Sequence, residues 1–206
     1  MLWAILAILV AFIWAALNIT DKFIITKWVR EPFAPLIIFG IVGLISSIFI
    51  YTFQGFSYLS HFNIFLTVLS GTIFVLTMWL YFKALKIEEV SRIIPMFYFS
   101  PLFTLILAAL FLDEIFTPVK YLGILLVVFG SIFLSSGNIS KIRVNKAFWL
   151  MILCTATVAL NSVITKYLLN FADYWTIFGY GRFGTFLASI PLFYFYMPDL
   201  ISSVRK

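Results

Sequence analysis

Long apolar segments, each nearly free of charge, limit what this chain of 206 residues can fold into. A helix needs about 20 mostly apolar residues to cross the hydrocarbon core of a bilayer. Only helices and closed barrels pair their backbone polar groups there, and these segments lack the alternating pattern of barrel strands. The expected spanning helices are residues 2–20, 33–53, 62–82, 93–112, 119–136, 148–166 and 175–197.

The composition supports lipid as the solvent for much of the surface. Hydrophobic residues make up 64% of the chain and charged residues 11%, whereas soluble domains carry about 25% charged residues. The apolar run that begins at Leu2 lacks the basic region of a cleaved signal peptide. We therefore expect an all-α, polytopic membrane helix bundle of about seven helices, with the first helix stopping at Asp21 and Lys22.

Basic residues are concentrated on one side of the predicted bundle. One side holds Lys22, Lys27, Arg30, Lys83, Lys86, Arg92, Lys141, Arg143, Lys146, Arg205 and Lys206. The other side holds only Lys120 and Lys166, and Arg182 lies inside the last helix. The positive-inside rule then predicts an integral protein of the cell (plasma) membrane, with the N-terminus outside and the C-terminus in the cytosol. The net charge of +6 forms no basic stripe, so no nucleic-acid partner is expected.

The residues that enzymes and metal sites require are scarce. Cys154 is the one cysteine and His61, expected in a loop, is the one histidine, so no intramolecular disulfide and no metal cluster of these residues is expected. No catalytic constellation and no Gly-rich phosphate loop is recognisable. We expect no cofactor and no enzymatic activity.

Two short sequence words recur in the same order. Ala-Leu-Asn at residues 16–18 recurs at 159–161, and Ile-Phe-Gly at residues 38–40 recurs at 177–179. Five helices separate the two starts, so the second copy would be inserted upside down, as in the inverted repeats of secondary transporters. The alternative is chance, because short apolar words recur in any membrane protein.

The stretch from residue 91 to residue 136 resembles the fourth and fifth helices of the EamA repeat, in the drug/metabolite transporter superfamily. The matching features are Pro101, the Leu-rich run into Asp113 and Glu114, Pro118, and the helix with Gly123 and Gly130. The segment Tyr-Phe-Lys-Ala-Leu-Lys at residues 81–86 resembles the end of the third helix of that repeat, and the pair at residues 182–183 resembles an Arg-Phe pair of its second helix.

The resemblance implies a secondary transporter that moves a small metabolite or organic solute by alternating access. Family members usually have ten helices, whereas residues 1–137 form a first five-helix repeat here and residues 147–206 form two helices of a second, incomplete one. The sequence leaves open a homodimer or missing C-terminal helices. The alternative function is a non-transporting membrane subunit, or an incomplete fragment that needs a partner chain.

Arg182 is the first candidate for binding a substrate. A charge at the centre of a membrane helix costs about 2.5–3.5 kcal/mol on insertion scales and usually faces a cavity. The guanidinium could hold a carboxylate through two hydrogen bonds. The alternative is a snorkelling or packing role.

Further candidates lie at helix breaks and at polar or aromatic positions. Pro95 and Pro101 each remove a backbone donor, which favours either a gating break or a simple kink. Glu114 is a gating candidate or a solvated carboxylate that pairs with Lys120. No carboxylate is expected in the middle of a helix, so proton coupling has no support from the sequence. The other substrate-binding candidates are Asn18, Asn161, Trp14, Trp79 and Tyr81.

These candidates have structural alternatives as well. The asparagines fit interhelical hydrogen bonds, and the aromatic residues fit interfacial belts or lipid-facing surfaces. Gly40, Gly43, Gly123 and Gly130 are expected to allow close helix packing.

Overall fold

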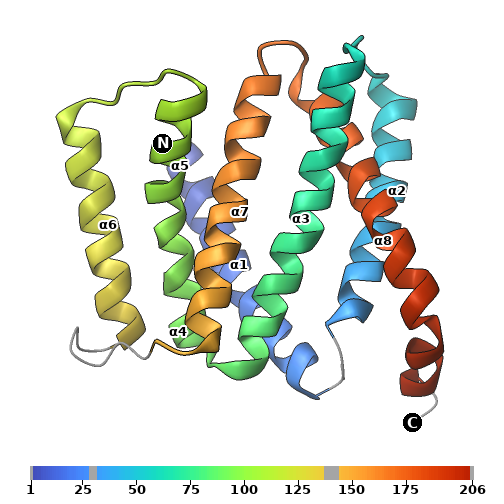
Figure 1. The fold of residues 1–206 in the computed structure, drawn as a ribbon, viewed down its shortest axis with the longest axis horizontal. Coiled ribbons are helices and arrows are strands. Elements are labelled where there is room, and N and C mark those ends of the chain that lie inside the picture. The colour runs from blue at the N-terminus through green and yellow to red at the C-terminus, as the bar shows by residue number, and fades with distance from the viewer. Residues whose placement is uncertain (1, 28–31, 137–143, 205–206) are drawn as a thin grey trace.

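The computed structural model describes residues 2–27, 32–136 and 144–204 (Figure 1). The regular elements of this part of the chain are helical and confirm the predicted bundle. Five of the basic residues used to predict the orientation lie outside the described residues: Arg30, Lys141, Arg143, Arg205 and Lys206. The elements are α1 (Leu2–Lys27), α2 (Phe33–Gln54), α3 (His61–Ile87), α4 (Val90–Met96), the 3-10 turn η1 (Phe97–Phe99), α5 (Ser100–Phe111), α6 (Pro118–Ser136), α7 (Lys146–Leu168) and α8 (Tyr174–Val204).

Five stretches of the described residues are long and apolar enough to cross a membrane. They are α1 from Ala4 onward, α2, α3, the stretch Val90–Phe111, and α7. The apolar part of α6 is shorter, and α8, which carries several tyrosines and Arg182, is not among the five. The chain is therefore an integral membrane protein.

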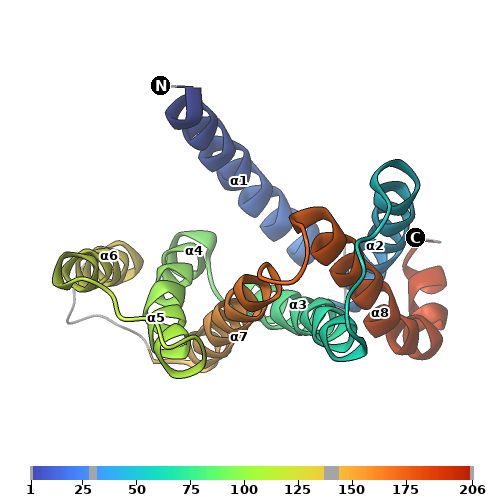
Figure 2. The same cartoon turned by 90° about the horizontal axis from the view of Figure 1, so that it is seen from above.

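Most helices stand side by side in one row, and α1 stands apart from it (Figures 1 and 2). In the row, α3 packs against both α7 and α8, and α2 packs against α8. Residues 5–17 of α1 are all exposed, whereas Ile25 near its end is buried. The contact of α1 with α3 and α4 therefore depends on the second half of α1.

The first helix is longer than the sequence predicts. Asp21 and Lys22 were expected to end it, but α1 continues through both to Lys27. Both side chains are partly buried there, since they find polar groups on α3 and at its end. His61 was expected in a loop and instead begins α3, where it is exposed.

Small residues let α8 approach its neighbours closely. A Cβ atom on Gly71 of α3 would lie 2.6 Å from the backbone nitrogen of Thr185 and 2.8 Å from the carbonyl carbon of Gly184. A Cβ on Gly43 of α2 would lie 2.8 Å from the carbonyl oxygen of Arg182. The expectation for Gly40 and Gly43 is therefore met by the packing of α2 on α8.

The same expectation is wrong for the glycines of α6. A Cβ on Gly123 or Gly130 would meet no atom within 4 Å in the described structure. The helix α6 packs mainly against α4, and both glycines lie on its exposed side.

Candidate functional site

The stretch expected as a fourth helix departs from α-helical geometry in its middle, where a short 3-10 turn separates two α-helices. Pro95 lies inside α4, three residues of 3-10 turn follow, and α5 then begins at Ser100. Pro101 occupies the first turn of α5, where a missing backbone N–H leaves no hydrogen bond unmade. The change of helix type thus lies between the two prolines, inside a stretch long enough to span the membrane.

Tyr81 of α3 lies beside this break and binds α1. Its ring centroid is 5.4 Å from that of Phe97 in η1, and its side chain is almost fully buried. The hydroxyl donates to Asn18 Oδ1 at 3.0 Å, and Asp21 Oδ2 lies 3.5 Å away. We call Asn18, Asp21, Tyr81 and Phe97 the Tyr81 cluster; it joins α1, α3 and the helix break.

Asn161 of α7 contacts the same central helix at another level. Its amide Nδ2 donates to the Ser70 carbonyl oxygen of α3 at 3.3 Å. Ser70 and Tyr81 are about three helical turns apart. The two asparagines at matching places of the repeated words therefore bind the two halves of α3 from different helices.

The tryptophan candidates do not join the Tyr81 cluster. Trp14 lies on the exposed part of α1. Trp79 is only two residues from Tyr81, so the two side chains leave α3 on different faces. The ammonium of Lys83 lies 3.8 Å from the centroid of the Trp79 ring, and Trp79 Nε1 is buried with no hydrogen-bond partner among the described residues.

Arg182 of α8 lies over two aromatic rings. Its guanidinium carbon lies 4.9 Å from the ring centroid of Phe74 on α3 and 4.5 Å from that of Phe178, one turn earlier on α8. The side chain is partly buried, and no described carboxylate forms an ion pair with it. The ring faces stabilise the cation, and the N–H groups of a guanidinium are donors that suit a carboxylate.

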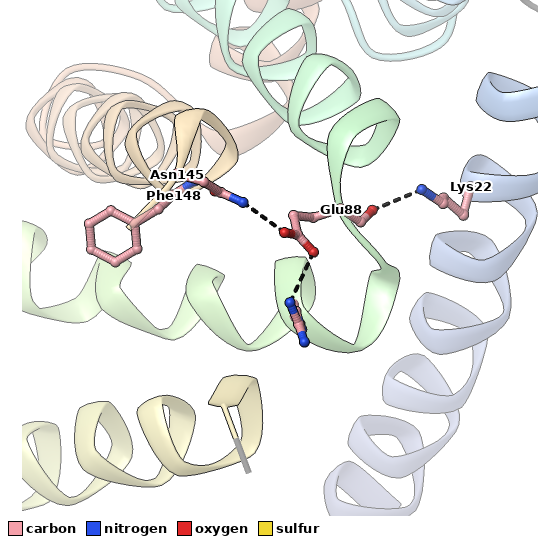
Figure 3. Close-up of polar contacts among 5 residues, drawn as sticks. Lys22, Glu88, Asn145 and Phe148 are labelled. Carbon is pink, nitrogen blue, oxygen red and sulfur yellow. Dashed lines mark hydrogen bonds and ion pairs between the residues drawn. The ribbon is translucent and has the colours of Figure 1, made fainter. Parts of the chain in front are cut away.

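A polar network closes the corner where α3 meets α4 (Figure 3). Lys22 donates from Nζ to the carbonyl oxygens of Leu85 and Glu88, the latter at 2.8 Å, and so caps the C-terminal end of α3. The Glu88 carboxylate accepts from Asn145 Nδ2 at 2.7 Å and pairs with Arg92 at 3.4 Å. We call these residues the corner network.

Asn145 has a second role in the corner network. Its Oδ1 accepts from the Phe148 backbone nitrogen at 3.0 Å and so caps the N-terminus of α7. One amide thereby connects the start of α7 to Glu88, and Glu88 connects it to the start of α4.

Replacing Glu88 with alanine should lower the stability of this corner. The change removes the acceptor of the Asn145 amide and the counter-ion of Arg92, at a cost of about 1–3 kcal/mol. Thermal unfolding of the purified protein in detergent would measure it. Glu89→Ala is the matched control, because the exposed Glu89 side chain makes no cap hydrogen bond. Equal midpoints for the two variants would contradict the expected role of Glu88.

The opposite end of the bundle carries separate polar contacts. Glu114, after α5, pairs with Lys166 near the end of α7, and not with Lys120 as expected from the sequence. Lys120 instead lies 5.5 Å from the ring centroid of Phe116. Glu114 thus connects the end of α5 to the end of α7, a contact between residues far apart in the chain.

Asp173 organises the start of α8 at this opposite end. Its carboxylate accepts from Ser57 Oγ and Thr176 Oγ1, both at 2.7 Å, and from the backbone nitrogens of Thr176 and Trp175 at 3.1 and 3.0 Å. These hydrogen bonds, that from Ser57 first, lower the pKa of Asp173 from 3.8 to about 2. The loop between α2 and α3 is thereby held on α8.

Asp173→Ala should destabilise the protein by about 0.5–2 kcal/mol at pH 7, because an N-cap is lost. Since the folded pKa of Asp173 lies below its ordinary value, the stabilisation is present above about pH 4 and disappears as the pH falls towards 2. Thermal midpoints of wild type and variant should therefore differ at pH 7 and converge as the pH falls towards 2. A gap that stays constant with pH would contradict this assignment.

The carboxylates and amide that organise these contacts but were not predicted from the sequence are Asp21, Glu88, Asn145 and Asp173. An Asn or Asp directly before a helix is a known N-cap signal, so Asn145 and Asp173 could have been found locally. The partners of Asp21 and Glu88 are about 60 residues away in the chain. No group of three or more His, Cys, Asp or Glu side chains that could hold a metal occurs in the described residues.

Comparison with known families agrees with this arrangement. The model of the EamA-like transporter family matches residues 1–136, which is more than half of the chain and extends from α1 to the end of α6. A comparison with curated protein sequences finds no match. The resemblance seen at the fourth and fifth predicted helices is confirmed, and this polytopic membrane protein belongs to the EamA-like transporter family.

Proposed function

We propose that the chain is a secondary transporter that moves a small metabolite or organic solute across the membrane by alternating access. The observation that carries this proposal is the 3-10 turn η1 between the prolines of the stretch α4–η1–α5, which packs on a buried tyrosine that binds α1. Irregular backbone at membrane depth is tolerated where protein or a cavity surrounds it. Broken helices commonly form the substrate sites of transporters.

Residues 1–137 would form the first repeat and residues 147–206 the start of an inverted second one. The contacts of Asn18 and Asn161 with the two halves of α3 support this assignment. The corner network lies at one end of the bundle, and the Glu114–Lys166 pair lies at the other. Polar contacts at both ends are what a protein needs to close each side in turn.

The orientation and the substrate sites belong to the same proposal. The basic residues favour an external N-terminus and a cytosolic C-terminus in the plasma membrane. Arg182 would hold an anionic group of the solute, and Asn18 of α1, Asn161 of α7 and Tyr81 of α3 would bind its other polar groups where α1 and α7 contact α3. Trp14, Trp79, Pro95, Pro101 and Glu114 would act as lining or gating residues.

Uptake into proteoliposomes tests the proposal. The purified protein would be reconstituted and given a panel of radiolabelled amino acids, with protein-free liposomes as the control. A transporter should show saturable uptake of at least one of them. If monodisperse, reconstituted protein moves none of these solutes, nor a panel of organic cations, the result favours the non-transporting membrane subunit.

A further inference from the structure

Asp21 is unusual among the carboxylates of this protein. Of those whose side chains the structure describes, the others lie at helix ends or in connections, whereas Asp21 lies within the spanning stretch of α1. It is partly buried, and an ionised carboxylate at such a place costs free energy unless other groups compensate for it. Charged residues inside membrane helices commonly mark paths for protons or ions.

The charged and titratable groups around Asp21 leave it without a counter-ion. Lys22 directs its ammonium to the end of α3, and Arg92 pairs with Glu88. On α3, Tyr81 contacts Asp21. From α7, the thiol of Cys154 donates to the Thr77 carbonyl oxygen at 3.5 Å. No described Lys or Arg forms an ion pair with Asp21.

The hydrogen bonds of the Tyr81 cluster depend on one more proton. A tyrosine hydroxyl carries a single hydrogen, yet the Tyr81 hydroxyl faces two acceptors, Asn18 Oδ1 at 3.0 Å and Asp21 Oδ2 at 3.5 Å. With Asp21 ionised, only one of these contacts can be a hydrogen bond at a time. With Asp21 protonated, Asp21 can donate to Tyr81 Oη while Tyr81 donates to Asn18, and both contacts are satisfied.

We propose that Asp21 is a proton-binding site, and that its protonation strengthens the contact between α1 and α3 through Tyr81. One proton from water binds Asp21 Oδ2, adds a hydrogen bond between α1 and α3, and is later released to water. Because residues 5–17 of α1 are exposed, this contact is a main attachment of α1 to the row of helices. Coupling of this proton to solute movement rests on the proposed transport function.

Infrared spectroscopy of the purified protein tests the site without any solute. As the pH is lowered, the wild type should gain a carboxylic-acid C=O band from protonated Asp21. The variant Asp21→Asn should lack this band. The control Glu89→Gln, which changes an exposed side chain, should retain it. In Tyr81→Phe the band should persist at a shifted frequency, because Asp21 has lost its hydrogen-bond partner. Identical titrations of wild type and Asp21→Asn would overturn the proposal.

Proteoliposomes with a pH gradient then test coupling, using the radiolabelled amino acids that the wild type takes up. Asp21→Asn should keep uptake down a solute gradient. Its accumulation of solute driven by the pH gradient should fall by a factor of about 10 or more. Full accumulation by Asp21→Asn would overturn the coupling role. If the wild type moves none of these solutes, the transport function fails, while the infrared titration still decides whether Asp21 binds a proton.

Discussion

Gly71→Leu should leave almost no folded protein. A Cβ on Gly71 would lie within 3 Å of the backbone of Thr185 and Gly184. Main-chain atoms cannot rotate away as a flexible side chain can, so α3 and α8 would have to separate. Overpacking of a well-packed site costs about 1–3 kcal/mol even where side chains can adjust, and here a whole helix pair must move. We expect a loss of more than about 3 kcal/mol.

The effect should spread beyond one helix pair. The helix α8 also packs against α2, through the close approach at Gly40 and Gly43. The helix α3 also packs against α7. Small residues at such crossings are the main device by which membrane helices pack, since lipid offers no hydrophobic driving force for association. A separation at Gly71 therefore disturbs four helices together.

Size-exclusion chromatography of tagged protein in mild detergent would measure the monodisperse fraction. Gly123→Leu is the matched control, because it adds the same side chain to an apolar helix where nothing lies within 4 Å. It should behave as wild type. If Gly71→Leu gives the same monodisperse yield as Gly123→Leu, the close crossing of α3 and α8 does not exist in the membrane.

The contrast between these glycines shows how far the sequence can be read. Hydropathy predicted seven spanning helices, and five of the described stretches are long and apolar enough to cross a membrane, because the length of an apolar run depends only on neighbouring residues. The glycine positions in the sequence also predicted close packing at Gly40, Gly43, Gly123 and Gly130 alike. Only Gly40 and Gly43 pack closely against another helix. Which face of a helix meets another depends on residues more than 100 positions away, and these are not visible locally.

The predicted end of the first helix was wrong for a related reason. Asp21 and Lys22 resemble a stop signal because charges are costly in lipid. In the fold, the Tyr81 hydroxyl and the last carbonyls of α3 are available to these side chains, so the helix continues. Both asparagines of the repeated Ala-Leu-Asn word form a hydrogen bond with α3. Their partners could not be named from the sequence.

The second large effect is expected at Arg182. Its guanidinium lies over the rings of Phe74 and Phe178, and no described carboxylate neutralises it. A partly buried guanidinium without a described counter-ion is costly to keep, and its fork of N–H donors fits a carboxylate. If a solute carboxylate binds there, Arg182→Gln should reduce its uptake at least about 100-fold, which corresponds to about 2.7 kcal/mol.

Two comparisons separate binding from packing at Arg182. Arg182→Lys keeps the charge but loses the planar fork, so a binding role predicts a large residual defect in uptake. Solutes that lack a carboxylate should be affected less than those that carry one. Thermal midpoints would be measured alongside, because loss of the two ring contacts should itself cost about 0.5–2 kcal/mol. If Arg182→Gln unfolds at a lower temperature yet takes up amino acids at the wild-type rate, Arg182 is a packing residue of the α3–α8 crossing and the anion must be bound elsewhere.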